Sequence, residues 1–221
     1  IIRLSTVATV ISVAVMIVTL SLANGFQETV SQKVFSFLGH VRIQEKQPGK
    51  AIISEDSPII KDDSLIISVR QNPQVKSIHP FATRYGILKT TDEMEGLLIK
   101  GLDSTYTYNH LNGFIREGRP IKFNDSTYSR EIMISAYTAK QLKLKLNDRI
   151  LIYFIRPEKR EGQQDGLPNI RPDKLTVTGI YKTGIEEYDK QFAIGDIKLI
   201  QRLNADSIEV ANGSYLEKIG G

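Results

Sequence analysis

The sequence predicts an α+β fold in which one N-terminal membrane-spanning helix precedes a polar, strand-rich domain. Two observations carry this prediction. Residues 4–23 are twenty consecutive positions without a charge, and beyond residue 39 short apolar runs alternate with Pro, Gly, Asn and Asp. The first pattern is typical of a helix in a bilayer and the second of strands and short helices. A chain of 221 residues suffices for one large domain or two small ones.

The composition excludes several classes of protein. The chain has no cysteine, which excludes structural disulfides, thiolate zinc sites, iron–sulfur clusters and a cysteine nucleophile. Its net charge is +4 with acids and bases interspersed, so no nucleic-acid partner is expected.

The uncharged stretch at residues 4–23 is interpreted as a transmembrane helix. At 1.5 Å per residue, twenty helical residues span roughly the 30 Å of a bilayer core. Its serines and threonines can bond back to carbonyls one turn earlier. Two alternatives remain open: a signal peptide cleaved after Ser21-Leu22-Ala23, and the buried core helix of a soluble protein. Because the chain begins with Ile1 and not methionine, we expect a piece of a longer protein.

The helix is predicted to continue beyond the membrane as an amphipathic stalk. After Gly25, apolar residues recur at spacings of three and four while polar residues occupy the other face. These apolar positions are Phe26, Val30, Val34 and Phe37.

The remaining chain is predicted to fold into strands and short helices. The expected strands are residues 40–45, 75–88, 95–101, 131–134, 149–155, 174–181 and 207–211. The expected helices are residues 64–71, 136–142 and 194–202. Ser135 stands where it can cap the second of these helices.

A long connection at residues 156–173 separates two of the expected strands. It contains three prolines and two glycines, and a structureless connection of this length is more often functional or disordered than incidental. Asp165-Gly166 is a tight-turn signal, which favours a protruding hairpin arm. A surface loop without a partner is the alternative.

No catalytic motif is recognisable. There is no G-x-x-x-x-G-K-[ST] phosphate loop, so ATP hydrolysis within this chain is not expected. Glu186, Glu187 and Asp189 form the densest acidic cluster, which favours a solvated turn over a cation site or an acid/base pair. The three histidines, which stand outside known catalytic motifs, are His40, His79 and His110.

Several segments together resemble one family. They are VMIVTLSLANGFQETV, GHVRIQ, VKSIHPF, LLIKGLD, EIMISAYTAKQLKLKLNDRILIYF and KLTVTGIYKTGIEEYDKQFAIGDIKLIQRL. In this order and spacing they are similar to the permease subunits of the lipoprotein-releasing ABC transporter, the LolC and LolE type, within the MacB and FtsX permease superfamily. Lys143 and Asn147 stand where the family usually has glycine. Asparagine also tolerates the left-handed backbone of turns.

The resemblance implies a MacB-like periplasmic core in two lobes. Residues 1–38 would be the first transmembrane helix and stalk. Residues 39–80 with 182–221 would form an incomplete membrane-proximal lobe, and residues 81–181 a distal lobe that carries the long loop. Three further spans would lie outside this sequence.

The resemblance also implies a function. The chain would belong to a non-catalytic permease subunit in the inner membrane, with its bulk in the periplasm, that extracts lipoproteins and hands them to a periplasmic carrier. Its partners would be a cytoplasmic ABC ATPase that binds ATP and Mg, a second permease subunit or a second copy, the lipoprotein cargo and membrane lipid. No cofactor is expected in this chain itself. The alternatives are a MacB-type efflux permease, an FtsX-like mechanotransmitter, and a membrane-anchored periplasmic binding domain without an ATPase.

Two sets of site residues follow from the resemblance, and neither is catalytic or metal-binding. The stalk residues Phe26, Val30, Val34 and Phe37 would pack against the partner permease and line the path of the lipoprotein's acyl chains. The loop residues that would bind the carrier are Arg156, Pro157, Glu158, Lys159, Arg160, Gly166, Leu167, Pro168, Ile170 and Arg171.

Overall fold

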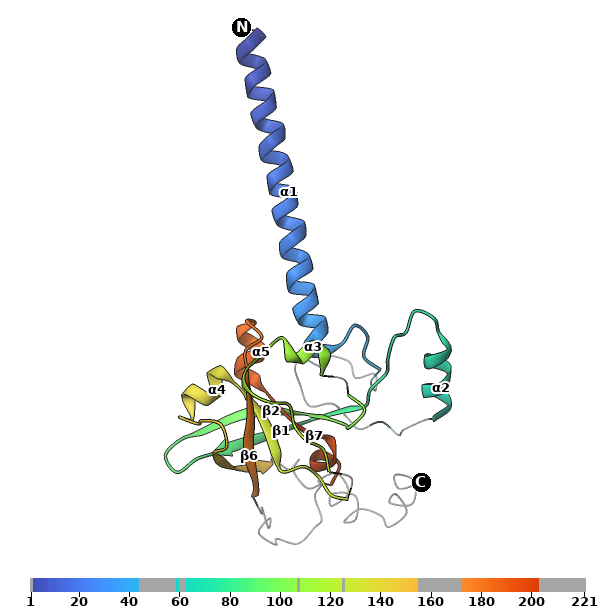
Figure 1. Ribbon diagram of the computed structural model, residues 1–221, viewed down its shortest axis with the longest axis vertical. Helices are drawn as coiled ribbons and strands as arrows, with labels where there is room; N and C mark the ends of the chain where they lie inside the picture. The colour runs from blue at the N-terminus through green and yellow to red at the C-terminus, as the bar shows by residue number, and fades with distance from the viewer. Residues whose placement is uncertain are drawn as a thin grey trace, which may run out of the picture. The chain divides into compact units, whose positions relative to one another are not determined.

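The computed structural model describes residues 2–43, 59, 63–106, 108–124, 126–154 and 172–202. Its elements are shown in Figure 1. The chain divides into two compact units, Ile1–Arg42 and Ile43–Gly221. The first unit contains one long helix and the second contains a mixed sheet with short helices, which confirms the predicted α+β class.

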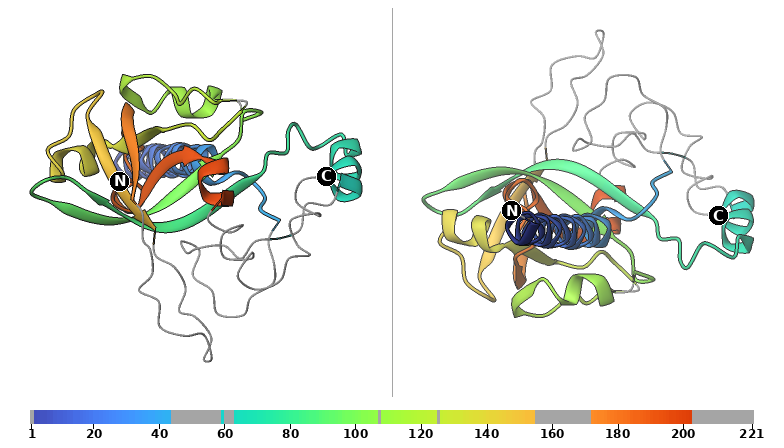
Figure 2. Two further views of the ribbon diagram at one scale, coloured as in Figure 1. Left: turned by 90° about the horizontal axis from the view of Figure 1, so that it is seen from below. Right: turned by 90° about the horizontal axis from the view of Figure 1, so that it is seen from above.

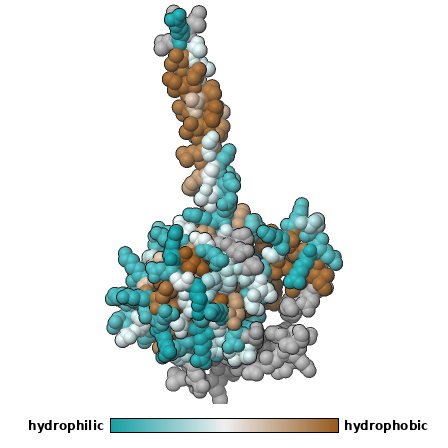
Figure 3. All heavy atoms as spheres, viewed as in Figure 1, coloured by the Kyte–Doolittle hydropathy of each residue, from teal (hydrophilic) through white to brown (hydrophobic). Residues whose placement is uncertain are grey.

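The first unit is the continuous helix α1 (Ile2–Leu38). From Ser5 to Leu38 it is long and apolar enough to cross a membrane, and Figure 3 shows its apolar residues in brown. Three threonines in it donate to carbonyls one turn earlier at 2.8–3.0 Å, so their hydroxyls are satisfied within the helix. The helix ends at Leu38, and the φ of +87° at the following Gly39 suits a glycine at the end of a helix.

The second unit is built on a seven-stranded sheet. Its strands are β1 (Phe81–Lys89), β2 (Met94–Leu102), β3 (Ile115–Gly118), β4 (Glu131–Ser135), β5 (Arg149–Phe154), β6 (Asp173–Tyr181) and β7 (Phe192–Asp196). The strand order is β3-β6-β4-β7-β2-β1-β5, and β5 also pairs with β6. This extra pairing closes six strands into a ring and leaves β3 outside it, beside β6. The long antiparallel hairpin of β1 and β2 is drawn in green in Figure 2.

Short helices connect or flank the strands. They are α2 (Asp63–Gln71), α3 (Asn109–Asn112), α4 (Ala136–Gln141) and α5 (Glu186–Gln191). The Ser135 side chain accepts a hydrogen bond from the Thr138 N–H at 3.0 Å, so the predicted cap of α4 is confirmed.

The core is formed by apolar side chains from the strands of the ring. Its members, which are almost fully buried, include Leu88, Leu97, Ile99, Ile132, Ile134, Ile150, Ile152, Leu175 and Val177. Beside them Tyr181 is fully buried, and its hydroxyl donates to the Phe192 carbonyl at 2.7 Å. Burial raises the pKa of Tyr181 well above its ordinary value, so this donor keeps its proton.

The predicted elements 64–71, 95–101, 131–134, 136–142, 149–155 and 174–181 are confirmed to within two residues where the structure describes them. The helix predicted at residues 194–202 is wrong in its first part. There β7 runs parallel to β2 and antiparallel to β4, and pairing on both sides outweighs the local helical pattern. A helical turn starts only at residue 197.

Three other predicted strands also differ or lie outside the described residues. The strand predicted from residue 75 starts at Phe81, directly after Pro80, which has no N–H to donate to a ladder. Residues 40–43 form no strand, while residues 44–45 and 207–211 lie outside the described part. The two-lobe division stays a prediction, and β7, from one predicted lobe, pairs with strands of the other.

Two residues between α4 and β5 adopt left-handed backbone. Lys143 has a φ of 54° and Asn147 a φ of 67°. The Asn147 N–H donates to the Val177 carbonyl at 2.7 Å, so the turn before β5 is tied to β6. The left-handed backbone at Asn147 agrees with the expectation that asparagine tolerates this conformation in a turn.

Gly118 is the position in β3 where we expect the largest loss of stability on substitution. Its φ is +81°, and a Cβ there would lie 2.2 Å from the Thr178 carbonyl oxygen and 2.7 Å from Leu146 Cδ2. Because the closer atom belongs to the β6 backbone, Gly118→Ala should cost about 3 kcal/mol of unfolding free energy. Urea unfolding of the whole chain in detergent, followed by circular dichroism, measures this cost.

The matched control for this change is Gly113→Ala. Gly113 has a φ of −65° and nothing within 4 Å of an added Cβ. Its substitution should change the free energy by less than about 1 kcal/mol. Equal effects of the two changes would contradict the close approach at Gly118.

The Arg119–Glu131 ion pair makes stability depend on pH. Arg119 donates to both Glu131 oxygens at 2.6 and 2.7 Å, and the Lys122 N–H donates at 2.8 Å. The hydrogen bonds from Arg119 hold the pKa of Glu131 below its ordinary value. A lowered folded-state pKa stabilises the fold above the unfolded pKa of about 4.3, and this contribution is lost as the pH falls through the folded pKa.

Glu131→Gln should therefore destabilise the chain by about 1 kcal/mol at pH 7, since the pair is partly exposed, and by much less near pH 3. Urea unfolding at the two pH values measures the difference. Glu117→Gln, in the exposed strand β3, is the control and should have little effect at either pH. A deficit of Glu131→Gln that stays constant between the two pH values would contradict the role of the charge.

Candidate functional site on the stalk face and at the loop stem

The four predicted stalk residues lie on one face of α1. At 100° per residue, Phe26, Val30, Val34 and Phe37 fall within about 80° of one another. Phe26 is 71% exposed and Val30 38% exposed, Val34 is partly buried, and Phe37 is buried. The structure therefore brings these side chains together as a stripe, and their contact with a partner helix stays a prediction.

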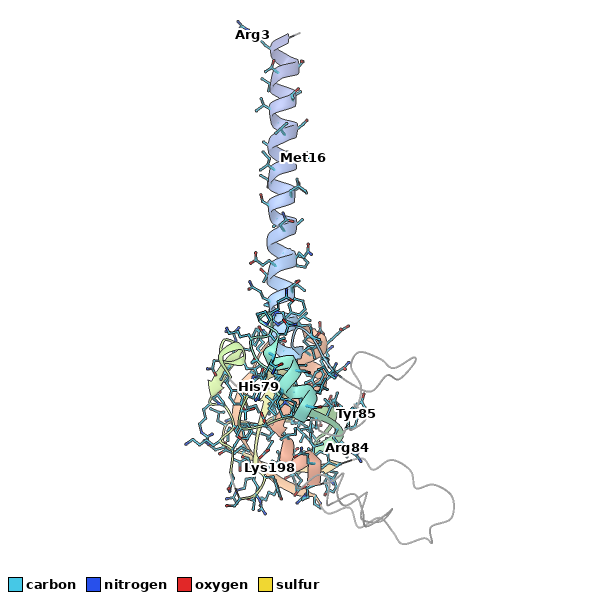
Figure 4. The ribbon with its side chains drawn as sticks, turned by 90° about the vertical axis from the view of Figure 1, so that its right-hand side faces the viewer. Arg3, Met16, His79, Arg84, Tyr85 and Lys198 are labelled. Atoms are coloured by element: carbon cyan, nitrogen blue, oxygen red, sulfur yellow. The ribbon has the colours of Figure 1, made fainter. Side chains whose placement is uncertain are left out.

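Exposed apolar side chains surround the first part of α1. Met16 is 62% exposed, and Figure 4 shows it midway along the helix, with Arg3 near the N-terminal end. None of the most apolar 18-residue window of this helix is buried in the structure. A helix exposed on all sides with such side chains fits a lipid environment.

The ten predicted carrier-binding residues all fall within residues 155–171, outside the described part of the chain. The strands that flank this loop are described. β5 and β6 run antiparallel and pair from Arg149 with Thr176 to Ile152 with Asp173. The loop therefore starts and ends on a paired two-stranded stem, as a hairpin arm requires.

Three side chains meet at the end of this stem. Arg202 binds Asp173 with 2.5 Å between Nη2 and Oδ2, and the Tyr128 hydroxyl donates to the other carboxylate oxygen at 2.9 Å. The Arg202 guanidinium also lies 4.5 Å from the centre of the Tyr128 ring. The sequence does not predict this cluster, because its members are distant from one another along the chain. The one available signal is the position of Asp173 as the last residue of the predicted loop.

The predicted acidic cluster has a structural role at one position. The sequence predicts a solvated turn at residues 186–189, but these residues begin α5. Asp189 is buried and accepts hydrogen bonds from the N–H and hydroxyl of Thr183, both at 2.8 Å, and from the Gly184 N–H at 3.2 Å. Ser135 donates to the Asp189 carbonyl. Asp189 therefore fixes the turn between β6 and α5.

The described histidines contact aromatic rings. His40 stacks on Phe35, with ring centres 4.6 Å apart. His79 meets the edge of Tyr106 at 5.4 Å and begins a row that continues to Tyr108. Burial raises the pKa of the Tyr108 hydroxyl. Among the described residues, no group of three His, Asp or Glu side chains could hold a metal ion.

Comparison with known proteins identifies the family of this chain. Residues 4–212 match the family model of the MacB-like periplasmic core domain. The chain belongs to this family. The match runs from the start of α1 through β7, so it covers both units of the MacB-like chain.

Two curated proteins are similar to the MacB-like chain. The lipoprotein-releasing system transmembrane protein LolE of Haemophilus influenzae is 24% identical over 176 residues, which cover 79% of this chain and 40% of LolE. The corresponding protein LolC of Buchnera aphidicola is 25% identical over 209 residues, which cover 92% of this chain and 47% of LolC. The resemblance predicted from the sequence is confirmed. The chain spans less than half the length of either relative.

One solved structure is also similar to this chain, at a lower sequence identity than the two curated proteins. It is the extracellular domain of the noncanonical ABC-type transporter YknZ from Gram-positive bacteria, with 16% identity and a TM-score of 0.42. The match covers 66% of this chain and 67% of that one.

Proposed function

We propose that the MacB-like chain is part of a permease subunit of an ABC transporter that extracts lipoproteins from the inner membrane and hands them to a periplasmic carrier. The observation that carries this proposal is the order along the chain. A helix long and apolar enough to span a membrane precedes a mixed sheet, and the match to the MacB-like periplasmic core domain covers both. Both curated relatives described above are named as lipoprotein-releasing system transmembrane proteins.

The proposed permease works with partners. A cytoplasmic ABC ATPase binds ATP and Mg and supplies the energy, since this chain has no phosphate-binding loop motif. A second permease subunit, or a second copy of this one, lies beside it in the membrane. The bulk of the chain lies in the periplasm.

The stalk transmits motion in this proposal. α1 continues without a break for 37 residues, which is about 55 Å at 1.5 Å per residue and exceeds the thickness of a bilayer core. A continuous helix is stiff along its axis, so a displacement at its membrane end reaches the periplasmic domain. Phe26 and Val30 are the exposed members of the stripe and, with the partly buried Val34, give the acyl chains an apolar surface outside the bilayer, whereas Phe37 is buried within this chain and is not available to them.

The loop between β5 and β6 binds the carrier in this proposal. Its stem is fixed on both sides, because β5 pairs with β1 as well as with β6. A rigid stem presents a binding segment at a lower entropic cost than a loose linker does.

Reconstitution tests the proposal. The complete gene product that contains this chain is placed in proteoliposomes with its ATPase, a lipidated substrate protein and purified periplasmic carrier. We expect ATP-dependent appearance of the lipoprotein in the soluble carrier complex, and none with a non-hydrolysable ATP analogue. Release that does not depend on ATP, or no transfer to the carrier, would contradict lipoprotein extraction.

A further inference from the structure

β6 begins at Asp173, three residues before its ladder with β4 begins. β4 and β6 run parallel, and their first pair is Glu131 with Thr176. The three residues of β6 before Thr176 therefore have β5 as their only described strand neighbour. At these three residues, the edge of β6 that later pairs with β4 has no strand beside it among the described residues, so other contacts must hold it.

The Tyr128–Asp173–Arg202 cluster supplies contacts at this point. Tyr128 lies three residues before Glu131, and Asp173 lies three residues before Thr176. Because the two segments run parallel, Tyr128 and Asp173 are level with each other. The Tyr128 hydroxyl donates a hydrogen bond to Asp173 at 2.9 Å. This side-chain contact joins the two segments at a level where the backbone ladder has not yet begun.

Arg202 completes the cluster from a third segment. It belongs to the helical turn that follows β7 and contacts both other members, the Asp173 carboxylate and the Tyr128 ring. The Asp173 side chain is only 12% exposed, whereas that of Arg202 is 40% exposed. A charge-assisted hydrogen bond to a nearly buried carboxylate is stronger than one between exposed groups. The cluster therefore holds together three segments that are distant in sequence.

We propose that Tyr128, Asp173 and Arg202 form a clamp that positions the β5–β6 loop for carrier binding. These residues are positioning residues and act through the last pair of the stem, Ile152 with Asp173. The inference rests on the proposed function for its link to the carrier. The clamp itself rests on the described contacts.

The test combines hydrogen–deuterium exchange with capture of purified periplasmic carrier by the complete gene product. Arg202→Gln removes the ion pair and the stacked guanidinium. Exchange of the amides at residues 173–175 should rise about tenfold, because a charge-assisted bond no longer opposes opening of the stem. Carrier capture should fall at least about fivefold, because part of the binding free energy must then be used to fix the stem. Amides of the β1–β2 hairpin should exchange as in the unchanged protein.

Matched variants separate the clamp from other effects. Arg130→Gln removes a second arginine near the Tyr128 ring, at 5.9 Å, and should change both readouts by less than about twofold. Tyr128→Phe keeps the ring and removes the hydroxyl, so its effects should be smaller than those of Arg202→Gln.

Each outcome decides a separate point. Unchanged exchange at residues 173–175 in Arg202→Gln would overturn the clamp. Raised exchange with unchanged carrier capture would overturn its positioning role. If the unchanged protein captures no carrier, the proposed function fails together with the link to the loop, and the exchange measurement still decides whether the clamp holds the stem.

Discussion

Deletion of residues 158–170 is expected to abolish capture of the periplasmic carrier while the domain stays folded. The deletion removes most of the segment proposed to bind the carrier. Five residues remain between Phe154 and Asp173, which is within the usual length of a hairpin loop. The stem pairs from Arg149–Thr176 to Ile152–Asp173 lie outside the deleted segment. Carrier pull-down measures the loss, and circular dichroism with thermal unfolding measures the retained fold.

A substituted loop is the control for this deletion. Replacement of residues 158–170 by a Gly/Ser linker of equal length keeps the connection and removes its side chains. Carrier capture should be lost in this variant too. Capture that survives both changes would refute a role of the loop in carrier binding. If the deletion unfolds the domain, the Gly/Ser variant alone decides whether the loop side chains bind the carrier.

Paired aspartates on the stalk are expected to abolish lipoprotein release. In Val30→Asp with Val34→Asp, two carboxylates enter the stripe proposed to contact the partner stalk and the acyl chains. An ionised carboxylate against an apolar surface costs several kcal/mol unless it finds a partner. Carrier capture should remain, because the loop is unchanged. ATP-dependent release in proteoliposomes measures the first effect and carrier pull-down the second.

The control places the same charges on another face of the helix. Gln32→Asp with Ser36→Asp has the same spacing of four residues but is turned by more than about 100° from the centre of the stripe. Release should stay close to that of the unchanged protein. Equal loss in both double variants would point to a general effect of charge on the stalk and would refute the stripe.

The long apolar helix and most central strands could be predicted because their signals are local. An uncharged run of twenty residues and the alternation in segments such as residues 149–154 are visible without knowledge of distant neighbours. The left-handed backbone at Asn147 also agrees with a local property, since asparagine tolerates this conformation in turns. These features depend on the nearby backbone.

What could not be predicted depends on pairing across the sheet. β7 has a sequence that also suits a helix, and only its neighbours β2 and β4 make it a strand. β3 has four residues and a shifted register, which leaves almost no pattern to detect. Asp189 resembled a solvated acid because its hydrogen-bond donors, Thr183 and Gly184, lie in a turn whose shape the sequence does not specify. The meeting of Tyr128, Asp173 and Arg202 depends in the same way on the register of β4 and β6.

The closed ring of strands has a consequence for self-association. Among the described strands, β3 alone has a neighbour on one side only. It is four residues long, it contains a register shift between Ile115 and Glu117, and it exposes Arg116 and Glu117. Short, irregular and charged edges are poor templates for strand addition from another chain. The described edge of this sheet is therefore a poor template for edge-to-edge aggregation between copies of the domain.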